Sequence, residues 1–193
     1  MSVRRSAVTV SAVLAALCTG VTPVADAAPT AAAETLNCTV NAAVSFSPPL
    51  SAGPKATTVA IGGTASGCED SLDGPTAVTG GTVTATLRFD AISCSPVTPP
   101  ALAPGSSATF TWNLKNGTQA SSTITDIAIV EVDGAGTLTG TVTGSSTRLA
   151  GEKLSALVDV TSDQPIVDNC VDVLLGTGQD IAHSTLTADA TFS

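Results

Sequence analysis

The sequence predicts an all-β protein: an antiparallel β-sandwich of eight or nine strands with immunoglobulin-like Greek-key connections, preceded by a signal peptide. Three observations support this fold class. Apolar and polar residues alternate along many short runs, of which residues 82–89 (TVTATLRF) are the clearest, and this period of two is that of a strand with one wet face. Turn dipeptides separate several runs. No window shows convincing helical spacing, and the many Thr and Val residues disfavour a helix.

The first expected element is a signal peptide over residues 1–27. Arg4 and Arg5 precede an apolar run too short for a stable membrane anchor, and Ala25 and Ala27 stand three and one positions before an expected cut at Ala28. The arginine pair leaves twin-arginine export open beside ordinary unfolded export. No later stretch approaches the ~20 apolar residues of a membrane helix. We therefore expect a secreted, extracellular protein without membrane insertion.

The remaining chain divides into a flexible leader over residues 28–35 and a single β-sandwich domain over residues 36–193. Within that domain, alternation predicts eight strands and one further candidate. The eight cover residues 36–46, 57–65, 82–89, 108–114, 121–132, 137–143, 153–161 and 184–192, and the ninth candidate covers 167–175.

The predicted connections are tight turns and one long loop. Asn116-Gly117 and Asp133-Gly134 each lie between alternating runs and tolerate positive φ, which predicts type I′ hairpin turns. Residues 95–105 contain four prolines that cannot donate hydrogen bonds, so we expect an extended surface loop that crosses between the sheets.

Four cysteines remain after the signal peptide, and an even number in an oxidising compartment predicts two disulfides. Three pairings are possible. We expect Cys68 to pair with Cys94, at the ends of neighbouring strands, and Cys38 with Cys170, which would tie the first strand to a late one. A zinc site is disfavoured, because the chain has no Cys-x-x-Cys motif and a single histidine.

The charge balance is strongly acidic, with a net charge of −9 for the whole chain. After residue 27 the chain keeps five basic residues against fifteen acidic ones. Such a surface repels nucleic acid and anionic lipids, so neither is an expected partner. The charge is expected to keep a secreted β-protein from associating edge to edge.

Candidate chemical groups are sparse. His183 is the single histidine and hence the natural general base, but there is no Gly-x-Ser-x-Gly elbow, and a strand-end histidine without a catalytic role is the simpler interpretation. Glu69, Asp70 and Asp73 could surround a calcium ion, although they lack the alternating ligand spacing of an EF-hand loop. We therefore expect no cofactor and no metal, with these three acids as the calcium candidates. Trp112 shares a strand face with Phe110 and is expected in the core.

One resemblance covers most of the chain after the signal peptide. The stretches at residues 109–117 (TFTWNLKNG) and 136–144 (GTLTGTVTG), with the four-cysteine layout, resemble a loose group of small secreted actinobacterial β-sandwich proteins of unassigned function. The resemblance implies fold and compartment, and no activity.

These observations predict a secreted non-catalytic module with a structural or interaction role, whose unknown partner would be a cell-envelope or extracellular protein. The alternative is a carrier of a small apolar ligand held between the sheets, which requires a cavity lined by Leu, Val and Ala. A third hypothesis is a hydrolase using His183. A filled core would favour the module, a deep apolar pocket the carrier, and a serine and carboxylate beside His183 the hydrolase.

Overall fold

The computed structural model describes residues 34–95, 101–132, 135–158 and 160–193, with the side chains of 131, 132, 135 and 160–167 left out. The expected signal peptide and most of the expected leader, the Asp133-Gly134 turn and part of the proline-rich loop lie outside these residues and stay predictions. Glu34 and Thr35, at the end of the expected leader, are bonded to the folded domain: Thr35 exchanges hydrogen bonds with Ser71.

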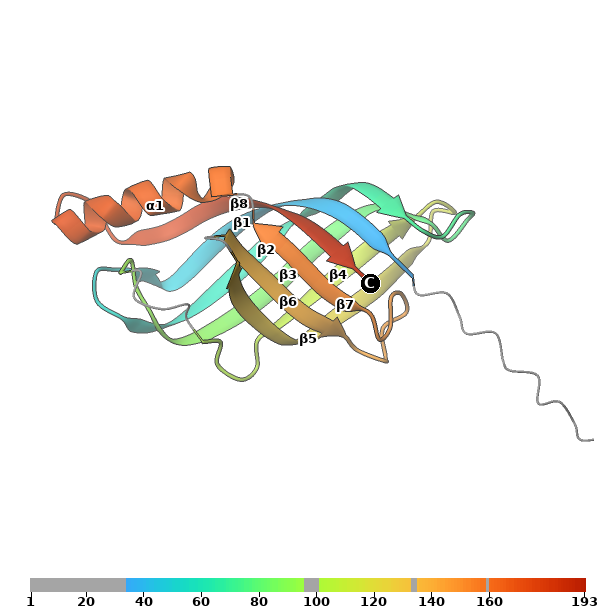
Figure 1. Ribbon diagram of the computed structural model, residues 1–193, viewed down its shortest axis with the longest axis horizontal. Helices are drawn as coiled ribbons and strands as arrows, with labels where there is room; N and C mark the ends of the chain where they lie inside the picture. The colour runs from blue at the N-terminus through green and yellow to red at the C-terminus, as the bar shows by residue number, and fades with distance from the viewer. Residues whose placement is uncertain (1–33, 96–100, 133–134, 159) are drawn as a thin grey trace, which may run out of the picture. The chain divides into compact units, whose positions relative to one another are not determined.

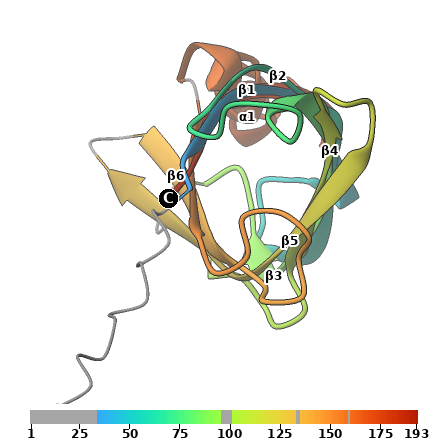
Figure 2. The ribbon, with the colours of Figure 1, turned by 90° about the vertical axis from the view of Figure 1, so that its right-hand side faces the viewer.

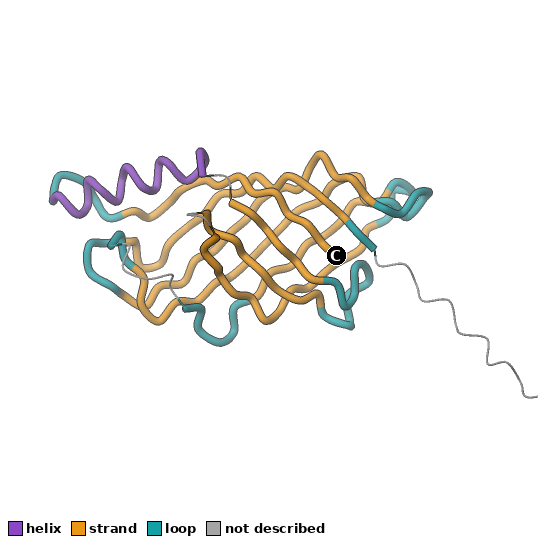
Figure 3. The backbone as a smooth tube through the Cα atoms, in the orientation of Figure 1, coloured by secondary structure: helices purple, strands orange, loops and turns teal. Residues whose placement is uncertain are grey.

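The described chain forms eight strands and one helix (Figure 3). The strands are β1 (Leu36–Leu50), β2 (Lys55–Asp70), β3 (Val78–Ile92), β4 (Ser107–Leu114), β5 (Gln119–Val132), β6 (Ala135–Val142), β7 (Lys153–Val158) and β8 (Ile181–Phe192), and helix α1 (Val160–Leu175) lies between β7 and β8. Each strand pairs antiparallel with the next in sequence, and β8 pairs with β1. The sheet therefore closes on itself, as the end-on view in Figure 2 shows.

The all-β class, the antiparallel pairing and the number of eight strands are confirmed, but the predicted Greek-key sandwich is wrong. The structure is a single closed barrel in which chain neighbours are always sheet neighbours. Alternation could not distinguish the two folds, because a sandwich and a barrel both bury every second residue of a strand. The difference lies in the pairing of β1 with β8, from Leu36 opposite Phe192 to Leu50 opposite Ile181.

Two local predictions are corrected at the connections. The hairpin at Asn116-Gly117 forms, but Gly117 alone has positive φ, and the Leu114 carbonyl accepts the N–H of Gly117. This is a three-residue loop with a left-handed glycine rather than a type I′ turn. The proline-rich loop, of which residues 96–100 are outside the description, joins the adjacent strands β3 and β4, so there is no second sheet to cross to.

Residues 160–175 form a helix, so the expected absence of helices is wrong. The ninth strand candidate at 167–175 lies in this helix, as does the end of the predicted strand at 153–161. Figure 1 shows α1 lying alongside the beginning of β8. Val173 of α1 is buried there with Leu50 and Ile181. Tertiary packing therefore overrides the low helix propensity of this Val-rich segment.

Alternation places apolar side chains inside the barrel and small polar ones outside. On β3, Val83, Leu87 and Phe89 are buried, while Thr82 and Arg88 are exposed. Gly81 also faces inward, where a Cβ atom would collide with the carbonyl oxygen of Thr111. Glycine therefore permits the close approach of β3 to β4 beside Trp112.

One end of the barrel is filled by aromatic rings. Phe110 stacks on Trp112 with ring centroids 4.8 Å apart, and Phe192 meets both rings edge-on at 5.3 and 5.4 Å. Trp112 is fully buried, which confirms its predicted place in the core. Its indole N–H donates to the Ser122 hydroxyl, which donates in turn to the Arg148 carbonyl. These bonds satisfy the polar atoms that this packing buries.

A buried ion pair lies at the same end. The Arg148 guanidinium donates to both carboxylate oxygens of Asp70, at 2.8 and 2.7 Å, and also to Glu34. Asp70 further accepts the N–H groups of Leu72 and Val78. Burial alone would raise the pKa of Asp70, but the hydrogen bonds from Arg148 and the two backbone amides, with the charge of Arg148, outweigh it and lower the pKa below its usual 3.8.

Two disulfides are present, as predicted, but the expected pairing is wrong. Cys38 pairs with Cys68 and Cys94 with Cys170. Between Asn37 and Thr39 the register of β1 on β2 shifts, so that Gly67 (φ +60°) and Cys68 lie opposite Cys38 in a β-bulge. Two disulfides indicate an oxidising environment. Within the described part of the chain, no helix is long and apolar enough to cross a membrane.

We predict that Asp70→Asn lowers the unfolding free energy by about 3 kcal/mol, because it removes the more deeply buried of the two carboxylates that pair with the Arg148 guanidinium. Since the pKa of Asp70 is lowered by folding, its contribution is complete above the unfolded pKa of ~3.9 and is lost as pH falls through the folded pKa. Chemical denaturation of the wild-type protein and of Asp70→Asn at several pH values measures the difference in unfolding free energy and its pH dependence.

The matched control is Asp73→Asn, three residues further along the chain and exposed. We expect it to change stability by less than about 0.5 kcal/mol. Equal stability losses in the two variants would contradict the role assigned to the ion pair.

Candidate functional site

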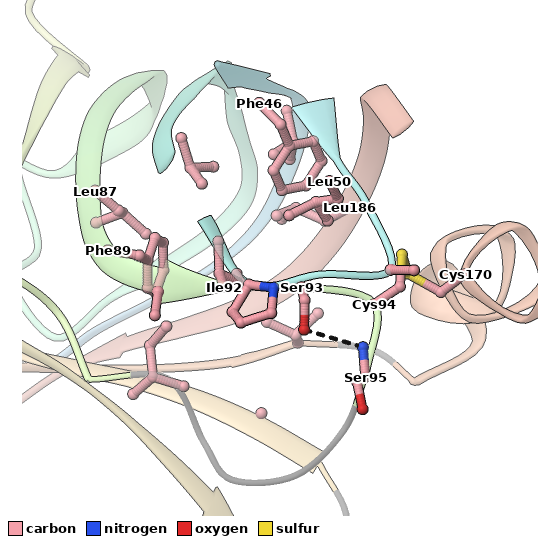
Figure 4. Close-up of a pocket in the computed structure, with 18 of the residues that line it drawn as sticks. Phe46, Leu50, Leu87, Phe89, Ile92, Ser93, Cys94, Ser95, Cys170 and Leu186 are labelled. Carbon is pink, nitrogen blue, oxygen red and sulfur yellow. Dashed lines mark hydrogen bonds between the residues drawn. A yellow bond between two sulfur atoms is a disulfide. The ribbon is translucent and has the colours of Figure 1, made fainter. Parts of the chain in front are cut away.

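A cavity of about 830 Å³ occupies the end of the barrel opposite the aromatic cluster (Figure 4). Leu87 and Phe89 lie on one side of it, and Phe46, Leu50 and Leu186 on another. Its volume falls within the ~300–1,000 Å³ range of small-molecule sites. The barrel is therefore filled at one end and hollow at the other.

Seven strands contribute to the cavity wall because alternate residues of each strand face the interior. On all seven strands the contributing positions lie toward the same end of the barrel. They are Val44, Phe46 and Leu50 on β1, Val59 and Ile61 on β2, Leu87, Phe89, Ala91 and Ile92 on β3, Ile129 on β5, Gly136 and Leu138 on β6, Val158 on β7 and Leu186 on β8.

Helix α1 completes the wall at the rim. Cys170, Val171 and Leu174 line the cavity, and the Cys94–Cys170 disulfide ties the helix to the segment that follows β3. Val171 and Leu174 remain 47% and 45% exposed. Apolar side chains that reach both the cavity and solvent place α1 at the entrance to the cavity.

The wall is almost without polar side chains. Of the described residues that line it, Ser93 and Ser95 carry the polar side chains, and none is charged. The Ser93 hydroxyl accepts the N–H of Ser95 at 3.2 Å, which leaves its own proton available. The arrangement can bury apolar surface and offer a hydrogen bond at the rim.

The structure places the sequence-predicted acids elsewhere. Asp70 pairs with Arg148 at the filled end, and Glu69 and Asp73 are exposed. Among the described residues, no group of three His, Cys, Asp or Glu side chains could hold a metal ion. Asp70 therefore has a structural role instead of the calcium-binding one considered from the sequence.

His183 is exposed on β8, opposite Ser45 of β1, and is not among the residues that line the cavity. Its neighbour in space, Ser45, has its hydroxyl directed at the Ala60 carbonyl at 3.5 Å. The structure thus does not bring His183 to the cavity.

Fold and site together define a closed eight-stranded antiparallel β-barrel with an internal apolar cavity. No protein-family model matches the chain, and no curated protein or solved structure matches it significantly. Fold and cavity geometry are therefore the basis for assigning a function, and the resemblance to secreted actinobacterial β-proteins stays a prediction.

Sequence reasoning missed the residues of α1 that line the cavity, although a signal was present. Val167, Cys170, Val171 and Leu174 follow the i, i+3, i+4, i+7 spacing of an apolar helix face. Alternation along a predicted strand indicates which residues face inward, but no sequence signal separates a residue that lines a cavity from one that packs in a core.

We predict that the double variant C94A/C170A releases α1 from the rim. Without the disulfide the unfolding free energy should fall by up to ~4 kcal/mol, since the bond closes a loop with a sequence separation of 76 residues. Amide hydrogen exchange in α1 should accelerate more than in the strands.

The control is C38A/C68A, which removes the disulfide between β1 and β2. This variant should lose stability without selective acceleration of exchange in α1. The same exchange pattern in both variants would show that the Cys94–Cys170 disulfide does not position the helix.

Proposed function

We propose that this protein is a secreted, non-catalytic binding protein that carries a small apolar ligand inside its barrel. One observation carries the proposal: a cavity of about 830 Å³ with an almost entirely apolar wall. A purely structural module would gain stability by filling this space with larger side chains, because the wall atoms would then gain packing contacts.

The energetics of the wall support binding. Water inside this space would find few hydrogen-bond partners, since Ser93 and Ser95 are the polar side chains of the described lining. An apolar molecule would replace such water and bury its own surface at about 25 cal/mol per Å². The eight-stranded barrel suits this role, because a barrel of this size is wide enough to hold one small ligand where side chains do not fill it.

A sequence prediction and a structural observation support an extracellular location. The predicted signal peptide would direct the chain out of the cell, and the two disulfides suit an oxidising space. An apolar compound is poorly soluble in such a space, and a carrier with an acidic, polar outer surface would keep it dispersed.

We predict that the neutral fluorescent probe N-phenyl-1-naphthylamine binds the protein and gains fluorescence, and that Leu186→Trp weakens this binding at least about tenfold. Leu186 projects from β8 into the cavity, where an indole would occupy the ligand's volume. Fluorescence titration measures the affinity, and thermal unfolding checks that the variant folds.

The matched control is Thr185→Trp, on the same strand but exposed. It should keep the affinity within about twofold, since adjacent strand residues face opposite sides of the sheet. Equal weakening by both variants, or no binding to the folded wild-type protein, would refute the cavity as the site.

The proposal includes the absence of catalysis. The lining described here has two serines but no histidine or carboxylate to activate them, and His183 is exposed on β8. We predict that His183→Ala leaves the affinity for the naphthylamine probe within about twofold. A hydrolytic activity of the pure wild-type protein that disappears in this folded variant would establish the enzyme hypothesis instead.

A further inference from the structure

We infer that the ligand is uncharged along its whole length, its polar end included, so that the cavity discriminates against fatty acids and other ionised amphiphiles. This inference rests on the proposed function, because it concerns the ligand of the same cavity. It goes further by specifying the charge of the ligand's polar end. That end reaches the rim of the cavity, where an ionised group could meet solvent or a residue of opposite charge.

The interior offers nothing to an ionised group. The described wall contains no charged side chain, and burying an unpaired charge in such surroundings is prohibitively costly. A charged amphiphile could bind only with its head group at the rim. The charges around the rim therefore decide whether such a ligand is accepted.

Of the basic residues that the structure describes, four lie away from the rim. After residue 33 the sequence has five of them, and the structure describes all five. Lys115 lies in the turn after β4, and Arg148 and Lys153 flank the start of β7; all three belong to the filled end of the barrel. Arg88 is exposed on β3, on the face opposite to the lining residues Leu87 and Phe89.

Lys55 is the one basic residue beside the rim, at the start of β2 next to the lining residue Pro54 and in register with Ile92. Its ammonium group already pairs with Asp180 at 3.8 Å. Asp172 is exposed on α1, immediately next to the lining residue Val171. An anionic head group would therefore find no unpaired basic residue among the described residues of the rim, and nothing there compensates for its charge.

A cationic head group would meet Asp172, but this acid is exposed to water, where such an attraction contributes only ~0–1 kcal/mol. The rim instead offers the Ser93 hydroxyl, whose proton remains available while its oxygen accepts the Ser95 N–H. A hydroxyl, ester or ketone group suits this donor. The preferred ligand is thus an apolar molecule with one neutral polar group.

The test compares three ligands with the same alkyl chain near pH 7: dodecanol, dodecanoate and dodecylammonium. Each ligand is titrated into the wild-type protein loaded with N-phenyl-1-naphthylamine, at ligand concentrations below those at which the ligand aggregates, and displacement of the probe is followed by fluorescence. We expect dodecanol to displace the probe at concentrations at least about tenfold lower than either ion. Lys55→Gln should change none of the three affinities by more than about twofold.

The outcomes separate this inference from the proposed function. If the probe does not bind, the proposed function fails. If the probe binds but dodecanoate displaces it at concentrations as low as dodecanol does, the inferred ligand class is wrong. Loss of dodecanoate binding in Lys55→Gln would then assign an anionic ligand held by that residue. Displacement by dodecylammonium as strong as by dodecanol would overturn the inference in favour of a cationic ligand.

Discussion

The pairing of β1 with β8 is the constraint on which the rest of this structure depends. Ten consecutive residues of β1, Leu36–Ser45, pair in register with β8, and this closes a sheet whose other strands follow chain order. Closure removes both sheet edges and encloses a space whose width is set by the number of strands. Had the same strands formed two sheets, their inner faces would have packed against each other without an enclosed cavity.

The two ends of the barrel differ in how their interiors are filled. At one end, Trp112, Phe110 and Phe192 fill the interior, and Arg148 and Asp70 form a buried ion pair beside them. At the other end, aliphatic side chains line the wall without meeting across it. A packed end can hold the strands in register while the other stays hollow, which is how a protein can tolerate an apolar cavity without collapsing onto it.

The disulfides match this division. Cys38–Cys68 joins neighbouring strands near the filled end, at a bulge where the ladder of β1 and β2 is interrupted. Cys94–Cys170 holds α1 against the rim of the hollow end, where Val173 adds a small buried contact. Among the described residues, neither the helix nor the rim carries an unpaired cation, which agrees with the neutral ligand that we propose.

The sequence alone determined the features that arise from local chemistry: eight alternating strands, the hairpin at Asn116-Gly117, the burial of Trp112 and the presence of two disulfides. Only the tertiary structure decided which cysteines pair, that residues 160–175 form a helix, and that the sheet closes around a cavity. The reason is physical. Alternation reports which side of a strand is buried, whereas closure, register shifts and unfilled volume arise from contacts between residues distant in the chain, such as Leu36 with Phe192.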